Sequence, residues 1–430
     1  MRWFFIFINF LVLGTTARAQ ISVDGLDELL TFADRNSPAA KQTQLQPYMA
    51  KQERNMQAAV LYPKVNAFAT GDYYPILATQ LIPAEALGGA PGTYLKAQFG
   101  LPYVFATGAE VSMPIINMNN WAKLSRAKAQ FEQSKYSSNA ALENLHMQLI
   151  QSYYQTLVTK EVLKLNEENE KTATELLRIM TDRNEQGVVD PADYNRAKNL
   201  SLDVKAARIS NNQTFQQSVN NLNALLGTDT VVLNEELDDF EWPMLYEPGN
   251  INNRPAWQEA AWKVRTAEMS LRESRTGGMP NLSVSGRYTY NMQTNFEPNF
   301  NNIDFNIASV SLRLNVPLFQ GGYYHSMQQR SKLQLQTAKL EQKRTEDNLT
   351  KQQEDWLAQY TAEFNKKEVL TEKLATAKDN LRIAKLSTKE GVMEFDEFNT
   401  LFMEYNKARI EYLQNLADGI LYHLLSTQNF

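Results

Sequence analysis

The chain has 430 residues, contains no cysteine, and carries 43 basic and 48 acidic residues. The lack of cysteine excludes disulfide bonds and a lipid-modified N-terminal cysteine, and the acidic balance offers no basis for nucleic-acid binding, which requires clustered lysine and arginine. The stability of the chain must therefore come from packing and assembly.

The N-terminal segment predicts export from the cytoplasm. Arg2 precedes an apolar run over 3–13, and the small-residue pattern at 17–19 predicts cleavage before Gln20. We therefore assign 1–19 to a signal peptide, which is too short to span a membrane. Cleavage would remove two arginines and leave 41 basic against 48 acidic residues, a net charge of −7.

The rest of the sequence contains no run of 18 or more apolar residues, the length that a membrane-spanning helix requires. The mature chain is therefore expected either to be soluble in the periplasm or to enter a membrane as a β-barrel.

An internal duplication organises the mature chain. Punctuating residues recur in the same order in two sets: Pro38, Pro63, Pro114 and Gly187, then Pro255, Pro280, Pro317 and Gly391. The intervals are 25, 51 and 73 residues in the first set and 25, 37 and 74 in the second, so only the middle segment differs. The sequence predicts two helix-strand-strand-helix-helix repeats, over 20–226 and 255–430, joined by a linker over 227–254.

The first repeat is expected to begin with a helix over about 38–60 and to continue with two strands. Apolar and polar side chains alternate over about 64–74 and again over about 104–115, the period of two that is typical of a strand with one apolar face. Segments of roughly 9 to 11 residues have the length that a tilted strand needs to cross a bilayer.

A long helix is expected after these strands, over 118–186, with a returning helix over 191–226. The outgoing helix would be roughly 100 Å long at 1.5 Å per residue, which exceeds what a globular domain needs. The returning helix is too short to pair with all of it. The helix over 38–60 would supply the missing length if the two shorter helices were stacked end to end.

The second repeat shows the same succession. We expect a helix over 255–276, strands over about 281–290 and 307–318, a long helix over 322–390 and a returning helix over 395–425. Within the strands, Val284 and Leu312 belong to the apolar face, whereas Ser285 and Ser311 belong to the polar face.

Apolar residues within the second pair of helices follow a spacing of about 3.5 residues, which is typical of left-handed coiled coils. The pattern comprises Leu370, Leu374, Ala377, Leu381 and Ala384, followed by Phe395, Phe398, Phe402, Tyr405, Tyr412 and Leu416. The same pattern would also suit the core of an ordinary helix bundle.

The strands are open to two interpretations, a soluble sandwich or a membrane barrel. Aromatic residues gather at the strand ends next to 75–103 and 291–306, and these two loops are rich in Gly, Pro and Asn, as expected on the outer side of a barrel. Four strands cannot close a membrane barrel, because open edges are not tolerated in lipid. Several copies of the chain must then pool their strands.

Sites for chemistry are scarce in the sequence. His146, His325 and His423 are widely separated and have no neighbour at metal-ligand spacing, so surface or packing roles are expected rather than metal binding. The sequence contains no nucleophile elbow, no His-Glu-x-x-His motif and no phosphate-binding glycine loop. We therefore expect neither an enzyme nor a bound cofactor.

Charged residues at two places remain as candidate functional groups. The turn candidates are the two punctuating glycines and the acidic residues that follow them. The candidates for a barrel lumen lie on the polar faces of the strands. The first set is Gly187, Asp190, Asp193, Gly391, Glu394, Asp396 and Glu397, and the second is Asp72, Glu110, Arg287 and Arg313. Acidic residues in a first helical turn also serve as caps, and the two roles can coexist.

These features together resemble the TolC-type outer-membrane efflux proteins. The opening segment 21–26 through Asn36-Ser37-Pro38 and the two glycine-centred turns, each followed by an acidic helix start, resemble the family, and the resemblance extends over nearly all of the mature chain. Unlike some members, the chain lacks a lipidated cysteine. Its first outer loop is 14 residues longer than its second, and the resemblance assigns no role to this longer loop.

The resemblance implies a mainly α-helical fold with a small transmembrane β-barrel contribution. Three copies would form a twelve-stranded barrel in the outer membrane and a helical tunnel through the periplasm. The implied partners are a periplasmic adaptor protein and an inner-membrane transporter, with lipid around the barrel and no nucleic acid.

The resemblance favours a passive channel that carries substrate from the transporter to the outside. A structural coiled-coil tether in the periplasm, without a conducting pore, is the alternative, and an envelope hydrolase has no catalytic residues to support it.

Overall fold

The computed structural model describes residues 20–237, 242–243, 249–297 and 302–427. The expected signal peptide over 1–19 lies outside the described residues, as do parts of the linker over 227–254. The fold class is the expected one, because long helices dominate and four long strands form one antiparallel sheet.

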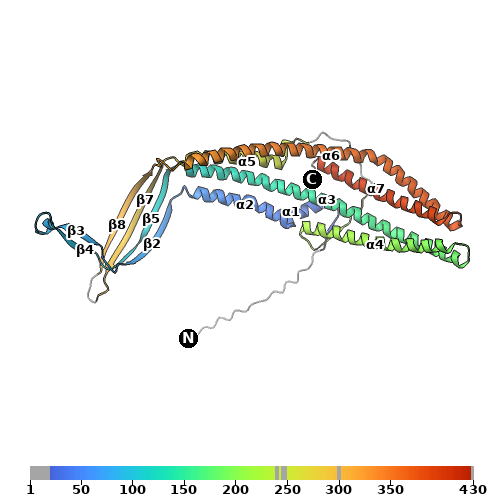
Figure 1. Cartoon of the computed structure of the whole chain (residues 1–430), viewed down its shortest axis with the longest axis horizontal. Coiled ribbons are helices and arrows are strands. Elements are labelled where there is room, and N and C mark those ends of the chain that lie inside the picture. Colours follow the sequence, from blue (N-terminus) through green and yellow to red (C-terminus); the bar gives the residue numbers. More distant parts are fainter. Residues whose placement is uncertain (1–19, 238–241, 244–248, 298–301, 428–430) are drawn as a thin grey trace, which may run out of the picture. The chain divides into compact units, whose positions relative to one another are not determined.

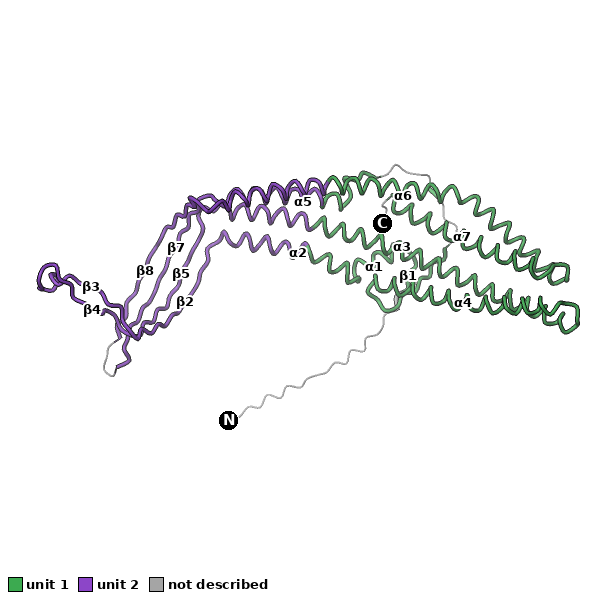
Figure 2. Tube along the Cα trace, in the orientation of Figure 1, with its two compact units in different colours: residues 1–46, 135–259, 343–430 green, residues 47–134, 260–342 purple. Residues whose placement is uncertain are grey.

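The chain divides into two compact units, and neither unit corresponds to one of the sequence repeats (Figure 2). Unit 1 comprises 1–46, 135–259 and 343–430, and unit 2 comprises 47–134 and 260–342. Each unit takes segments from both repeats, because the long helix of each repeat contributes its first part to unit 2 and its remainder to unit 1. The duplication is therefore a repeat of elements and not a pair of independent domains.

The core of unit 2 is a four-stranded antiparallel sheet in the order β2-β5-β7-β8 (Figure 1). The strands are β2 (Lys64–Tyr73), β5 (Tyr103–Asn117), β7 (Asn281–Thr294) and β8 (Ile303–Asn315). At the centre of the sheet, β5 of the first repeat pairs with β7 of the second. Each of the outer strands, β2 and β8, has only one neighbour in the described part of the chain, so the sheet has two open edges.

The strand bounds differ from the expected ones mainly in the second repeat. The strand expected over 307–318 begins at Ile303 and ends at Asn315, and the strand expected over 281–290 continues to Thr294. Proline cannot donate to a strand ladder, which accounts for the end of β8 before Pro317.

A β-bulge interrupts the alternation near the end of β5. Pro114 pairs with Ser283 and Ile116 pairs with Leu282, so Ile115 is the extra residue. An uninterrupted alternation would place Ile115 on the apolar face, and the bulge gives that position to Ile116 instead. Bulges of this kind bend a strand and shift its side chains by one position.

The long first loop contains structure that the sequence pattern did not indicate. Strands β3 (Thr79–Pro83) and β4 (Tyr94–Gln98) form an antiparallel hairpin, with the short 3₁₀ helix η1 (Ala84–Leu87) between them. The backbone N–H of Gly89 donates to the carbonyl of Ala84 at 2.7 Å, which closes the turn after η1.

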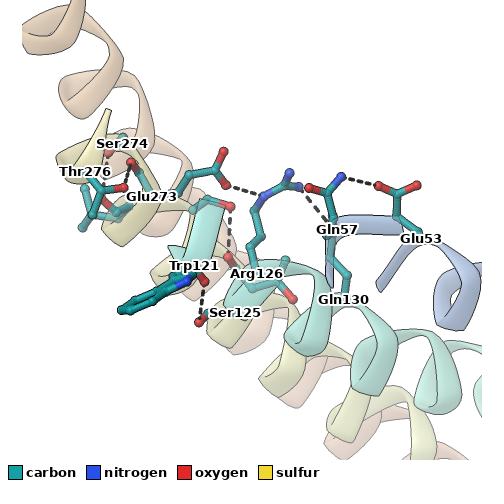
Figure 3. Close-up of polar contacts among 12 residues, drawn as sticks. Glu53, Gln57, Trp121, Ser125, Arg126, Gln130, Glu273, Ser274 and Thr276 are labelled. Carbon is teal, nitrogen blue, oxygen red and sulfur yellow. Dashed lines mark hydrogen bonds and ion pairs between the residues drawn. The ribbon is translucent and has the colours of Figure 1, made fainter. Parts of the chain in front are cut away.

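Helices of both repeats also meet in unit 2. The segments involved are the second half of α2 (Pro38–Ala59), most of α5 (Pro255–Thr276) and the first parts of α3 (Met118–Glu185) and α6 (Tyr323–Glu390). Arg126 of α3 donates to Glu273 of α5 at 2.6 Å and to Gln130 at 3.3 Å (Figure 3). This ion pair joins the two repeats next to the strands.

The second long helix begins one residue later than expected. Gly321 and Gly322 have φ values of 56° and 82°, so both lie in the left-handed region that favours glycine, and α6 starts at Tyr323. None of the described helices has the length and apolarity required to cross a membrane.

Unit 1 contains the main hydrophobic core. Its elements are β1 (Gln20–Val23), α1 (Leu26–Asn36), α4 (Pro191–Leu226), β6 (Thr230–Leu233), η2 (Ile251–Asn253), α7 (Phe395–Thr427) and the remaining parts of α2, α3, α5 and α6. Strand β1 pairs in parallel with β6, so the N-terminal segment joins the linker between the repeats. Leu29, Tyr153, Leu226 and Leu413 lie at the centre of this core, each essentially inaccessible to solvent.

A second apolar cluster joins all four long segments of unit 1 near their turns. It includes Leu176 of α3, Leu200 of α4, Leu381 of α6 and Phe398 of α7. The expected apolar spacing therefore identifies buried positions, and the residues pack in a four-helix arrangement.

Candidate functional site

The two glycine-centred turns have the same backbone geometry. Gly187 and Gly391 have φ values of 69° and 81°. In each turn, the N–H of the residue after the glycine donates to a carbonyl five residues earlier, at 3.0 Å from Val188 and at 2.9 Å from Val392. This is a helix-ending arrangement that requires a left-handed residue, which explains why glycine recurs at both positions.

The acidic residues after Gly187 take part in the start of α4. Asp190 is the N-cap, because its carboxylate accepts a hydrogen bond from the backbone N–H of Ala192 at 2.8 Å. Asp193 lies in the first turn, where its carboxylate is 3.2 Å from Arg196. In this turn both residues stabilise the helix start, in agreement with the capping interpretation.

The acidic residues after Gly391 occupy the corresponding positions of α7. The carbonyl of Glu394 accepts from the N–H of Phe398 at 3.2 Å, and Asp396 and Glu397 lie in the first helical turn. Asp396 is largely exposed and forms an ion pair of 2.9 Å with Arg196.

Two arginines that sequence reasoning did not single out connect the two helical hairpins. Arg196 of α4 contacts both Asp193 and Asp396, and Arg183 of α3 donates to the carbonyl of Lys389 at 2.9 Å. The spacing of Asp193 and Arg196 on one helix was available as a signal. The contacts with α6 and α7 were not, because they depend on tertiary packing.

The four charged candidates on the strands share one face of the sheet. Glu110 pairs with Arg287, and Arg313 pairs with Ser283, two residues from Ser285 and four from Arg287 along β7. Asp72 of β2 lies six residues from Asn66, which pairs with Glu110. Directly paired residues and residues two apart on a strand point to the same side, so the charges face one way.

An aromatic ring supports one of these charges. The Arg287 guanidinium lies 4.4 Å from the centroid of the Phe68 ring, on the same face of the sheet. Cation–π contact of this kind orients an arginine without neutralising it.

The opposite face of the sheet is apolar and uncovered. Val284 pairs with Leu312 on this face, and Val310 and Leu312 are 81% and 70% exposed. A soluble chain rarely leaves such a continuous apolar face open to water. The sheet thus has one apolar and one charged face.

The histidines do not gather into a site. His146 lies 2.8 Å from Asp34, and His423 contacts the ring of Tyr360, where burial lowers the pKa of the imidazole. Within the described residues, no group of three or more His, Asp or Glu side chains is arranged to hold a metal ion.

Comparison with known proteins identifies the same family over most of the chain. A family model described as outer membrane efflux protein matches residues 29–228 and 250–418. A sequence comparison with curated proteins gives no match.

Solved structures similar to the chain show the same fold at low sequence identity. A membrane protein from Pseudomonas aeruginosa has a TM-score of 0.75 and 19% identity, and the match covers 93% of this chain and 91% of that one. The CmeC outer membrane channel of Campylobacter jejuni has a TM-score of 0.76 and 15% identity, with 93% and 84% covered. The open state of the MtrE outer membrane channel of Neisseria gonorrhoeae has a TM-score of 0.73 and 17% identity, with 94% and 89% covered.

Proposed function

The chain belongs to the outer membrane efflux protein family, and from this premise we propose that it is a passive channel of a tripartite efflux or export system. It would carry substrate from an inner-membrane transporter, through a periplasmic adaptor protein, to the outside of the outer membrane. The observation that carries this proposal is the four-stranded sheet with two open edges, one apolar face and one charged face.

Three copies would complete the barrel. Open strand edges are not tolerated in lipid, and three four-stranded sheets would give twelve strands without a free edge. The apolar face that bears Val284 and Leu312 would contact lipid. The charged face that bears Asp72, Glu110, Arg287 and Arg313 would line the lumen.

The two turns would form the periplasmic entrance of the channel. Three copies would bring the carboxylates of Asp193, Glu394, Asp396 and Glu397 around one opening, where rings of acidic side chains attract cations. Arg196 would hold the two hairpins of each chain together through Asp396 in the closed state. An adaptor protein would then open the entrance by loosening this contact.

We propose that the chain neither catalyses a reaction nor binds a cofactor. The free energy for transport would come from the inner-membrane transporter, so the channel itself has no need of nucleotide binding. The signal peptide over 1–19 would direct its export across the inner membrane. The barrel would then hold it in the outer membrane, with the helices extending into the periplasm.

Channel and tether are distinguished by conductance. Purified full-length protein, reconstituted in planar lipid bilayers, should give discrete current steps, with larger steps when the Arg196–Asp396 contact is removed. Outer-membrane protein that forms a stable trimer but never conducts under either condition would favour a structural tether.

A further inference from the structure

A hollow in unit 1 lies just before the turn at Gly391 and is distinct from the acidic residues described above. It is formed by α3 and the last turns of α6, with one side chain from α7, and has a volume of about 380 Å³. Small-molecule sites commonly have volumes of roughly 300 to 1,000 Å³. The hollow is therefore large enough for a small ligand.

A buried hydroxyl group in the wall of the hollow has no hydrogen-bond partner among the described residues. Thr388 is only 1% exposed, and its Oγ1 is unpaired. Other threonines of the same helix satisfy this group locally, since Thr361 and Thr371 donate to carbonyls four residues earlier at 2.7 and 2.8 Å. Burying an unpaired hydroxyl costs stability, which points to a partner that the chain does not supply.

The charges around the hollow are mainly positive. Lys171, Lys385 and Lys389 line it, against the single carboxylate of Glu175. That carboxylate is engaged by Arg178 at 2.9 Å, whereas the Lys385 ammonium donates to the hydroxyl of Thr172 at 2.9 Å. In the described part of the chain, the three ammonium groups have no carboxylate within ion-pair distance.

Apolar side chains complete the wall. Leu176 and Phe398 are 3% and 2% exposed, while Leu386 lies at the rim with 56% exposure. The hollow thus combines ammonium groups and a free hydroxyl with an apolar floor.

We propose that this hollow binds an amphiphilic carboxylate. The carboxylate would accept hydrogen bonds from Thr388 and from the ammonium groups of Lys385 and Lys389, and the apolar chain would lie over Leu176 and Phe398. Because α3 and α6 belong to different hairpins, the bound molecule would hold the hairpins together near their turns. The assignment does not depend on conduction through the channel.

The test is a titration of the full-length protein in detergent with octanoate, followed by saturation-transfer NMR of the ligand, with empty micelles as the blank. Thr388→Val removes the unpaired hydroxyl at nearly constant shape, and Lys385→Gln removes one charge. Lys351→Gln, at an exposed position of the same helix, is the matched control.

Octanoate should bind saturably, with affinity about tenfold weaker or more in Thr388→Val and in Lys385→Gln, and unchanged in Lys351→Gln. Without ligand, Thr388→Val should unfold at the same or a higher temperature, because an unpaired buried hydroxyl is removed. This result separates lost recognition from lost folding.

Three results would overturn the proposal. Acetate binding as tightly as octanoate would show an adventitious ion only, and octyltrimethylammonium binding as tightly would show an apolar surface without charge preference. An octanoate affinity that is unchanged in Thr388→Val would show that the hydroxyl takes no part in binding. Each of these results leaves the bilayer conductance test independent, so failure of this site and failure of the channel proposal are distinguishable.

Discussion

Asp193 and Asp396 lie on different helices, yet Arg196 contacts both carboxylates, at 3.2 and 2.9 Å. The acidic residues at the turns therefore differ in what they do within one chain. Asp190 caps its own helix, whereas Asp396 takes part in a contact between hairpins. Substitutions at these positions should separate helix stability from channel properties.

The double substitution Asp193→Asn and Asp396→Asn should reduce cation preference and the effect of divalent ions on single-channel current. Exposed ion pairs contribute at most about 1 kcal/mol, so the unfolding temperature should change little. Single-channel recordings in asymmetric salt and thermal unfolding provide the two measurements. Wild-type conductance, selectivity and divalent block in a destabilised protein would mean that these residues act only at the helix starts.

Substituting Asp190 should have the opposite profile. Asp190→Ala should destabilise the start of α4 by about 1 kcal/mol, because the N–H of Ala192 loses its acceptor. Asp190→Asn is the matched control, since an asparagine side chain can still cap the helix. Amide hydrogen exchange over the first turn of α4 should show faster exchange in Asp190→Ala alone. Equal protection in both variants would contradict the capping role.

At the scale of elements, the register of the sheet determines which face each of the alternating side chains lies on. Val284 pairs with Leu312 on the apolar face, and Ser285 pairs with Ser311 on the charged face. Adjacent residues of one strand thus meet different surroundings in the proposed barrel.

Leu312→Arg should impair insertion of the protein into membranes, by roughly 2 to 4 kcal/mol for a position near the bilayer midplane. Ser311→Arg, one residue away, should be tolerated because it adds charge to a face that already bears Arg287 and Arg313. The yield of folded protein in the outer-membrane fraction measures the insertion of each variant. Equal losses for the two variants would show that the faces have been assigned incorrectly.

The β5–β7 pairing offers a test with two glycines. A methyl group at Gly108 would meet the backbone carbonyl of Tyr288, whereas one at Gly286 has open space around it within the described chain. Gly108→Ala should therefore disrupt the pairing of the two repeats, at a cost of about 1 to 3 kcal/mol, and Gly286→Ala should not. The two purified variants would be compared by the denaturant concentration at which each unfolds. A stable Gly108→Ala variant would place the strands further apart than in this structure.

At the scale of the whole molecule, the open edges of β2 and β8 predict assembly. Detergent-extracted protein should come from the outer-membrane fraction and run as a homotrimer in light scattering, because three sheets close a twelve-stranded barrel. A cysteine pair introduced near the middle of β2 and β8 should cross-link neighbouring chains. A monodisperse monomer, or recovery in the soluble periplasm, would contradict the channel proposal.

The sequence by itself determined the duplication, the succession of helices and strands, and which strand face is apolar. These features are local, because each depends only on residues that are close together in the sequence. They are a period of two, a period of 3.5 and a glycine that ends a helix. The charged residues Asp72, Glu110, Arg287 and Arg313 could be assigned to the polar faces of their strands for the same reason, and the register of the sheet then places them on one side.

Only the tertiary structure decided how distant segments meet. The bulge at Ile115, the hairpin within 75–103, the contacts of Arg196 and the unpaired hydroxyl of Thr388 could not be read from any local pattern. The register between strands and the partner of an arginine are set by the free energy of packing segments that lie far apart in the sequence. For Arg196 and Asp396, 200 residues separate two side chains that form one ion pair.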